Sequence, residues 1–522
     1  MAFFDFHVHP ALKSFFSEDS PTTQKLSPWV RISKDSIPPV MRWCTEFPYI
    51  IQTQANLSQL LVNDLNLVCV ALYIPERMFL DNDLIEAGTR SRMRVFLQRH
   101  KVDTILQGNP YELLVTDDLE TLLHPEKFGV TDRKIKPIFK ATDYQAGDEK
   151  TLHLVFTLEG CHVLSNQLGV YNKDQILQNL EDLRKRVSLL SINLTHIEQS
   201  PICNHAFGMQ FINDDAFKPT GNGISPDGVD IIRSCYEHNI MVDIKHMSLS
   251  ARLQLYRLRS RGTLGANLPP IVATHVGFTG LSVNQIPDYV YDYERPARKQ
   301  YTRLWQGKPV LYGGQSPRPA FNASSINLYD DDIVQILQSG GMIGLSLDKR
   351  ILGYQEYDKQ ADEPYCLEEE YVSYAEENLF LPARSGASIG RAFPDDRCMT
   401  WQEIYEAPEV TPALSDYHLD YFMAHVLHLI RVAQQNNYDI TEALKQVCIG
   451  SDMDGMINPI TTCLTYDDIY YLKQDFVAQF VSFAADSDVA LPAGFEINQF
   501  ANQLFHENGK NFVLNRLSLL NP

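Results

Sequence analysis

Paired cysteine motifs, dense runs of basic residues and long apolar stretches are all missing from this 522-residue sequence. Its nine cysteines include no CxxC pair, and an odd number cannot all pair with one another. This excludes zinc-finger and redox-motif classes and favours free thiols in a reducing compartment. No stretch of about 18 uncharged apolar residues occurs, so we expect no membrane span. A formal net charge of -20 without a basic run argues against nucleic acid or anionic lipid as a partner.

The two ends of the chain also lack targeting signals. The opening MAFFDFHVHP has no basic segment, no apolar stretch of signal-sequence length and no small-residue cleavage site. The closing RLSLLNP has no hydrophobic anchor tail. We therefore expect a cytoplasmic protein.

What the sequence does contain is a repeated alternation of short apolar runs with helical segments, at an ordinary hydrophobic content of 44%. The apolar runs are bounded by polar turns, which predicts strands, and the windows between them carry apolar residues every three or four positions, which predicts helices. Helical windows cover 174–187, 227–239, 330–339 and 419–437. Predicted strands cover 2–8, 65–74, 152–160, 189–196, 240–247, 269–276, 341–348 and 446–455.

Eight strands that alternate with helices predict a (β/α)₈ TIM barrel, an α/β fold that needs only about 250 residues. The surplus is expected in three insertions, at about 76–150, 277–325 and 352–412. Each insertion follows the C-terminal end of a predicted strand, where loops cover an active site in such barrels. We therefore predict a single barrel domain over residues 1–522 with long insertions.

Polar residues stand at the C-terminal ends of the apolar runs, where a buried parallel strand is expected to carry Val, Ile or Leu. Because the C-terminal ends of barrel strands converge on one mouth, we expect these side chains to meet there. They are His7, His9, Glu159, His196, His246, His275 and Asp452.

The chemistry of this set points to divalent metal ions. His7 and His9 are two positions apart, so strand alternation places both on one side, where they can hold one ion together. Imidazole nitrogens and carboxylate oxygens suit Zn²⁺, and a carboxylate can bridge two ions. Two such ions would hold a hydroxide and polarise a carbonyl, while a nearby carboxylate moves the proton. Asp452 fits that last role, whereas Asp454 precedes Gly455 and is interpreted as a turn residue that bonds nearby backbone.

Six short motifs occur in the order typical of the membrane (renal) dipeptidase family, the peptidase branch of the amidohydrolase superfamily, which the chain resembles. DFHVHP is similar to the family's DGHxD opening, TLEG to its strand with a bridging glutamate, and INLTH to its substrate-contacting histidine motif. VDIKHMS is similar to VDVSHxS, VATHVG to the SHS strand, and IGSDMDG to GSDFDG. NGKNFVLNRL resembles the family's GENFLRV ending, so the resemblance omits only the insertions.

The resemblance implies a metal-dependent hydrolase that cleaves the amide bond of dipeptides or similar small carboxylate-bearing amides. It implies two Zn²⁺ ions per chain, although other divalent ions stay open. His7 and His9 would hold the first ion, His246 and His275 the second, and Glu159 would bridge them.

The same resemblance assigns further roles around the metals. His196 would contact the substrate carbonyl or the tetrahedral oxyanion, and Asp452 would be the catalytic proton shuttle. Asp5 and His425 are candidates for orienting the metal ligands, and a purely structural role is equally open for both.

Two departures from the family pattern bear on affinity and substrate choice. The family has Asp where this chain has His9, so the first metal site loses a negative charge. The family's Arg-Asn pair, which grips a substrate carboxylate, is disrupted because Ile326 precedes NLYDDDI. Arg318 is the candidate for substrate binding, with Arg295 and Arg298 as alternatives.

Two other functions stay open on the sequence. One is a superfamily hydrolase that acts on an N-acyl amino acid, a cyclic amide or a lactone. The other is a catalytically silent metal-binding barrel. In each hydrolase reading the partner is a small molecule, and the sequence is compatible with a homodimer.

Overall fold

A computed structural model gives the structure of the chain. It describes residues 2–13, 28–29, 31–33, 47–77, 105–124, 134–148, 151–207, 217–284, 290–294, 301–306, 312–313, 321–322, 324–353, 368–373, 376 and 412–520.

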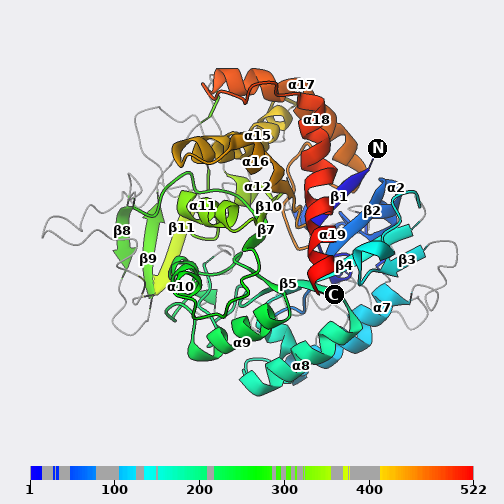
Figure 1. The fold of residues 1–522 in the computed structure, drawn as a ribbon, viewed down its shortest axis with the longest axis vertical. Coiled ribbons are helices and arrows are strands. Elements are labelled where there is room, and N and C mark those ends of the chain that lie inside the picture. The colour runs from blue at the N-terminus through cyan, green and yellow to red at the C-terminus, as the bar shows by residue number, and fades with distance from the viewer. Residues whose placement is uncertain are drawn as a thin grey trace, which may run out of the picture.

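Eight parallel strands form the centre of the molecule (Figure 1). Their order in the sheet is β1-β2-β4-β5-β6-β7-β10-β12, so neighbours in the barrel follow each other along the chain. All eight predicted strands are present, and most are shorter at their C-terminal ends than the predicted runs. Their bounds are β1 Phe3–Val8, β2 Leu65–Leu72, β4 Thr151–Glu159, β5 Leu189–Asn193, β6 Met241–Asp243, β7 Val272–Val276, β10 Met342–Leu345 and β12 Val447–Ile449.

The sheet closes on itself where the segment after β12 meets the end of β1. Val8 and Met453 form a parallel bridge. The amide of Asp452 donates to the carbonyl of His7 at 2.9 Å, and the amide of His9 donates to the carbonyl of Met453 at 3.0 Å. The result is a nearly closed barrel of eight parallel strands, which confirms the predicted TIM-barrel fold.

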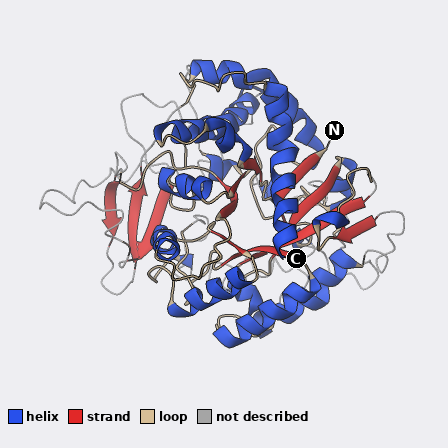
Figure 2. Cartoon of the chain, viewed as in Figure 1, coloured by secondary structure: helices blue, strands red, loops and turns tan. Residues whose placement is uncertain are grey.

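Helices surround the strands, as Figure 2 shows. The four predicted helical windows are α8, α9, α11 and α15. Several helices begin at a side chain that caps the free backbone amides of the first turn; Ser225, for example, accepts from Gly228 at the start of α9. The helices along the chain are α1 Phe47–Ile51, α2 Leu57–Val62, α6 Pro110–Leu113, α7 Leu119–Leu123, α8 Lys173–Arg186, α9 Pro226–Glu237, α10 Leu249–Ser260, α11 Asp330–Gln338, α12 Lys349–Leu352, α15 Pro412–Gln435, α16 Ile440–Lys445, α17 Ile469–Asp486, α18 Ile497–Asn502 and α19 Asn508–Leu520.

The core has two parts. The larger cluster of buried apolar side chains lies between the strands and the surrounding helices. The smaller cluster takes residues from all eight strands together with Val513 and Leu517 of α19, and we call it the barrel base. Its strand members are Phe4, Phe6, Leu67, Cys69, Val155, Leu190, Met241, Val272, Met342 and Cys448. The helix α19 therefore packs over one end of the barrel and leaves the other end to the polar strand termini.

The insertions build their own strands. Within 76–150, β3 (Lys134–Pro137) pairs with the first half of β4. Strands β8 (Val290–Glu294) and β9 (Tyr301–Gln306) come from the second insertion, and β11 (Glu368–Ser373) comes from the third.

These last three strands form one antiparallel sheet in the order β11-β9-β8, at the edge of the molecule in Figure 2. Val372 packs with Leu249 of α10, Leu281 and Tyr329. Glu376 accepts a hydrogen bond from Ser248, the N-cap of α10, at 2.5 Å. The second and third insertions thus lie together and are joined to the barrel beside β6.

The six cysteines among the described residues are free thiols. In the same part of the chain, no helix combines the length and apolar character needed to cross a bilayer.

Candidate metal centre

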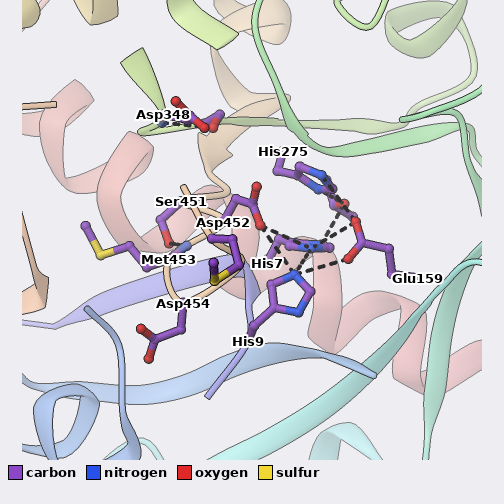
Figure 3. Close-up of polar contacts among 12 residues, drawn as sticks. His7, His9, Glu159, His275, Asp348, Ser451, Asp452, Met453 and Asp454 are labelled. Atoms are coloured by element: carbon purple, nitrogen blue, oxygen red, sulfur yellow. Dashed lines mark hydrogen bonds and ion pairs between the residues drawn. The ribbon is translucent and has the colours of Figure 1, made fainter. Parts of the chain in front are cut away.

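The five side chains predicted to hold metal ions lie together at the open end of the barrel. Figure 3 labels four of them, His7, His9, Glu159 and His275. His7 and His9 have their Nε2 atoms 3.0 Å apart, and the Nε2 of His9 is 3.1 Å from Glu159 Oε2. On the other side, the Nε2 atoms of His246 and His275 are 3.1 Å apart, and they lie 3.1 and 3.4 Å from Glu159 Oε1. Glu159 therefore lies between the two pairs, with Oε2 facing His9 and Oε1 facing His246 and His275, and with His7 Nε2 3.6 Å from the same Oε1.

The backbone around two of these side chains departs from an extended strand. His246 and Asp452 have φ values of 67° and 61°, in the left-handed region that few residues other than glycine adopt. They follow β6 and β12 by three residues, because each strand ends before the polar motif begins. Turns, and not strand alternation, therefore aim these two side chains into the mouth.

The charges of the cluster favour a cation. Burial opposes ionisation of Glu159, but the facing His196, His7 and His9 imidazoles hold its pKa well below the usual range. Burial would also lower the pKa of His9, but the carboxylates of Glu159 and Asp452 outweigh it and raise that pKa to about 10. The carboxylates thus attract positive charge to the point between them, which a proton or a divalent ion can supply.

The second histidine pair is prepared differently. Burial, together with the neighbouring His196, lowers the pKa of His246 well below its usual value. Burial and the neighbouring His7 do the same for the pKa of His275. Both imidazoles are therefore neutral near pH 7, which is the form that coordinates metals.

The residues fit the implied metal ions in donor type and in spacing. The described residues contain three groups whose potential ligand atoms all lie within 4.8 Å of one another. They are His7, His9 and Glu159; Glu159, His246 and His275; and His7, His275 and Asp452. Two nitrogens bound to one Zn²⁺ at about 2.0–2.1 Å are about 3.3 Å apart at the tetrahedral angle, close to the separations within each pair.

Asp452 and His196 lie at the more open rim of this cluster. Asp452 Oδ1 is 3.3 Å from His9 Nε2, and His196 Nε2 is 3.6 Å from Glu159 Oε1. Their side chains are 16% and 12% exposed, whereas the five predicted ligands are 1–8% exposed. A molecule that enters from solvent would therefore meet these two side chains at the approach to the cluster.

A buried carboxylate that the sequence reasoning missed holds His196 in place. Glu76 Oε1 is 2.5 Å from His196 Nδ1, and Glu76 Oε2 accepts from the Tyr73 hydroxyl at 2.5 Å. Burial opposes ionisation of Glu76, but His196 and His162 hold its pKa well below the usual range. Burial would lower the pKa of His196, yet Glu76 and Glu159 outweigh it and raise that pKa. Glu76 follows β2 by four positions, and the end of this strand, like that of β10, was assigned no polar residue.

The two aspartates of IGSDMDG have separate surroundings, as Figure 3 shows. Asp454 is fully buried and accepts hydrogen bonds from the amides of Gln54 at 2.7 Å and Ala55 at 3.1 Å. It bonds backbone, as predicted, but of a segment 400 residues away and not of its own turn. Gly455 leaves space for the side chains of Asp452 and His9, since a Cβ there would lie 2.1 Å from Asp452 Oδ1 and 2.8 Å from His9 Cδ2.

The two residues proposed to orient ligands act on different parts of the structure. Asp5 accepts from the backbone amides of His7 at 2.9 Å and Ser451 at 3.0 Å, and also from the Tyr466 hydroxyl. It therefore ties β1 to the turn that carries Asp452. Burial raises the pKa of Asp5 to about 6.

His425, in α15, lies elsewhere. Its Nδ1 is 2.8 Å from the Tyr421 carbonyl, and its ring packs on Phe321 and Phe278. Among the contacts of the described residues, none joins it to a predicted metal ligand. Arg295, Arg298 and Arg318 fall outside the described residues.

No family model and no curated protein matches this sequence. Among solved structures, the chain is similar to a metallo peptidase from Rhodobacter sphaeroides liganded with a phosphinate mimic of the dipeptide L-Ala-D-Ala, with a TM-score of 0.50 and 13% identity over 99% of each chain. A second metallo peptidase, dipeptidase AC, gives the same TM-score, identity and coverage. At this identity the likeness shows a shared fold.

Proposed function

We propose that this chain is a metal-dependent hydrolase of the membrane dipeptidase type, which cleaves the amide bond of dipeptides or of similar small carboxylate-bearing amides. The observation that carries the proposal is the placement of Glu159 between two histidine pairs, with Asp452 at the open side of the cluster. The substrate class is supported by the dipeptide mimic in the Rhodobacter sphaeroides structure. The whole chain is proposed to act as one barrel domain.

The ligand assignment follows the two histidine pairs. His7 and His9 would hold one ion, His246 and His275 the other, and Glu159 would serve both. Zn²⁺ suits this nitrogen-rich donor set, and each ion would act as a Lewis acid toward a carbonyl and would acidify water.

Two side chains at the rim would carry out the proton transfer and the charge stabilisation. Asp452 accepts a proton from the attacking water and passes it to the leaving amine nitrogen, because its carboxylate is partly exposed at the rim and next to His9. His196 donates from Nε2 to the carbonyl oxygen as negative charge develops there, while Glu76 fixes its Nδ1.

A free carboxylate on the substrate requires a cation at the mouth. Arg318 stays our first candidate, with Arg295 and Arg298 as alternatives, since an Arg binds a carboxylate through two parallel hydrogen bonds. Each Arg is replaced by Met in a separate variant. We expect KM on an accepted dipeptide to rise in one of the three variants only. Carboxyl-amidated dipeptides that are cleaved equally well would argue against this part of the proposal.

The function is tested with purified chain loaded with Zn²⁺. L-Ala-L-Ala and L-Ala-D-Ala are assayed beside N-acetyl amino acids, cyclic amides and lactones, with and without a chelator. The Asp452→Asn variant serves as the matched control for contaminating peptidases. We expect dipeptide cleavage that is lost with chelator and in the variant.

The other outcomes separate the alternatives. If the chain cleaves acyl amino acids, cyclic amides or lactones in place of dipeptides, the proposal of a metal-dependent hydrolase would stand. Its substrate class would then be the compounds that are cleaved. A metal-loaded chain that cleaves none of these compounds would indicate a silent metal-binding barrel.

A further inference from the structure

The four histidines of the metal centre differ in what holds the nitrogen that faces away from the cluster. Nδ1 of His9 and Nδ1 of His246 are buried and have no hydrogen-bond partner among the described residues. Nδ1 of His7 and Nδ1 of His275 both contact the hydroxyl of Thr274, at 3.0 and 3.1 Å. Each histidine pair therefore contains one held member, and the same hydroxyl holds both.

The direction of these hydrogen bonds follows from Asp243, which also contacts the Thr274 hydroxyl. Thr274 Oγ1 is 2.5 Å from Asp243 Oδ2, and an ionised carboxylate can only accept. The hydroxyl therefore donates its hydrogen to Asp243 and has only lone pairs to offer the two imidazoles. Both imidazoles must then carry their hydrogen on Nδ1, which leaves an Nε2 lone pair on each that points toward Glu159.

Thr274 and Asp243 are fixed between the barrel base and the metal centre. Each lies two positions beyond a base residue on its strand, Val272 on β7 and Met241 on β6. Asp243 Oδ1 accepts from the amides of Lys245 at 3.0 Å and Thr274 at 3.3 Å, which joins the two strands. A Cβ on Gly450 would lie 1.7 Å from the Thr274 carbonyl oxygen, so this glycine makes room for β7.

We propose that Thr274, oriented by Asp243, is a shared positioning residue that sets the tautomers of His7 and His275 and so raises the metal affinity of both sites. The inference rests on the proposed metal centre. Nothing in the ligand assignment alone requires that one hydroxyl affect both ions. Partners that orient a metal-bound histidine typically contribute 10- to 100-fold to metal affinity.

The test measures Zn²⁺ binding to the full chain by competition with a chromophoric chelator, independently of activity. Thr274→Val keeps the shape of the side chain and removes the hydroxyl, and Thr274→Ser restores it. Thr157→Val is the matched control, because Thr157 is a buried threonine of β4, another barrel strand, and its hydroxyl has no partner among the described residues. Thermal unfolding of the metal-free variants reports any general loss of stability.

We expect Thr274→Val to bind both Zn²⁺ ions about 10- to 100-fold more weakly, and Thr274→Ser and Thr157→Val to bind like the wild type. If Thr274→Val does not fold, Asp243→Asn serves instead, because its amide can donate to the hydroxyl and reverse the hydrogen bonds. Unchanged affinity in Thr274→Val, or weakening of one site alone, would overturn the shared role. A wild-type chain that binds no Zn²⁺ would instead overturn the metal centre itself.

Discussion

The barrel base and the metal centre are built on strands of the same barrel for opposite purposes. Val155 in the base and Glu159 in the metal centre lie four residues apart on β4, which is about 13 Å along an extended strand. Cys448 of the base and Asp452 are also four residues apart, although Asp452 lies in the turn after β12. The base is held by the removal of apolar surface from water, whereas the metal centre gathers buried polar atoms whose principal partners are one another.

This contrast predicts that substitutions in the two layers have separable effects. A change in the base should lower stability and spare the chemistry of the correctly folded fraction. A change at the metal centre should do the reverse, provided that the shape of the side chain is kept.

The largest expected effect separates the two neighbouring aspartates. Asp452→Asn keeps the shape of the side chain but removes the proton acceptor, so kcat on an accepted substrate should fall about 10²- to 10⁴-fold with KM much less affected. Asp454→Asn should cost stability, because Asp454 accepts from the Gln54 and Ala55 amides. Steady-state kinetics at full metal occupancy, with urea unfolding, measures both. Loss of turnover in the Asp454 variant with an active Asp452 variant would reverse the assignment.

A substitution in the base tests the other side of the comparison. Leu190→Ala removes a fully buried side chain of β5 and should lower the free energy of unfolding by about 2–5 kcal/mol. Zn²⁺ affinity of the folded chain should stay within about twofold, because Leu190 belongs to the barrel base and not to the metal centre. Urea unfolding measures the free energy of unfolding, and chelator competition on the same preparation measures the Zn²⁺ affinity. A large loss of Zn²⁺ affinity at full folding would show that the two layers are not separable.

Glu76 provides a smaller effect at the rim. Glu76→Gln keeps an oxygen near His196 Nδ1 but removes the negative charge, so kcat should fall about 10- to 100-fold. Tyr73→Phe is the control, since it removes the hydroxyl that donates to Glu76 and leaves the contact of Glu76 with His196. Kinetics and Zn²⁺ content are measured for both variants. Equal losses in the two would mean that the charge of Glu76 is not what matters.

Substitution of His425 should give the smallest effect, a change in stability that is seen only at acidic pH. Burial lowers the pKa of His425 to about 3, so the neutral imidazole contributes stability above about pH 6.5 that is lost as the pH falls toward 3. Both proteins are compared without metal. From pH 7 to 5.5, the free energy of unfolding of the wild type should fall by about 1 kcal/mol relative to that of His425→Phe. Zn²⁺ affinity at pH 7 should be unchanged. If stability depends on pH in the same way in both proteins, or if the variant loses Zn²⁺ affinity, a purely structural role for His425 would be contradicted.

The eight strands were predictable because each is a contiguous apolar run between turns, and hydrophobic periodicity reports such runs directly. The C-terminal ends of most strands were overestimated. After β6 and β12, His246 and Asp452 continue the sequence pattern in a left-handed backbone conformation that periodicity does not reveal. The antiparallel sheet that joins the second and third insertions was missed, because its strands come from segments far apart in the chain.

The metal-ligand set was predictable from the residue types at the strand ends, whereas the residues that orient it were not assigned. Asp243 and Thr274 lie inside the predicted strands 240–247 and 269–276, and the polar side chains in these apolar runs were the available signal. Glu76 lay at the boundary of the first insertion and was counted with it. These partners are defined by contacts across the barrel, which a single sequence does not contain.

The central claim is that Glu159 serves two metal ions held by two separate histidine pairs. Metal content per chain, measured by elemental analysis after Zn²⁺ loading and desalting, tests it most directly in the wild type, Glu159→Ala and His246→Ala. We expect up to two ions in the wild type, loss at both sites in Glu159→Ala, and retention of the ion at His7 and His9 in His246→Ala. Full metal content in Glu159→Ala would contradict the claim.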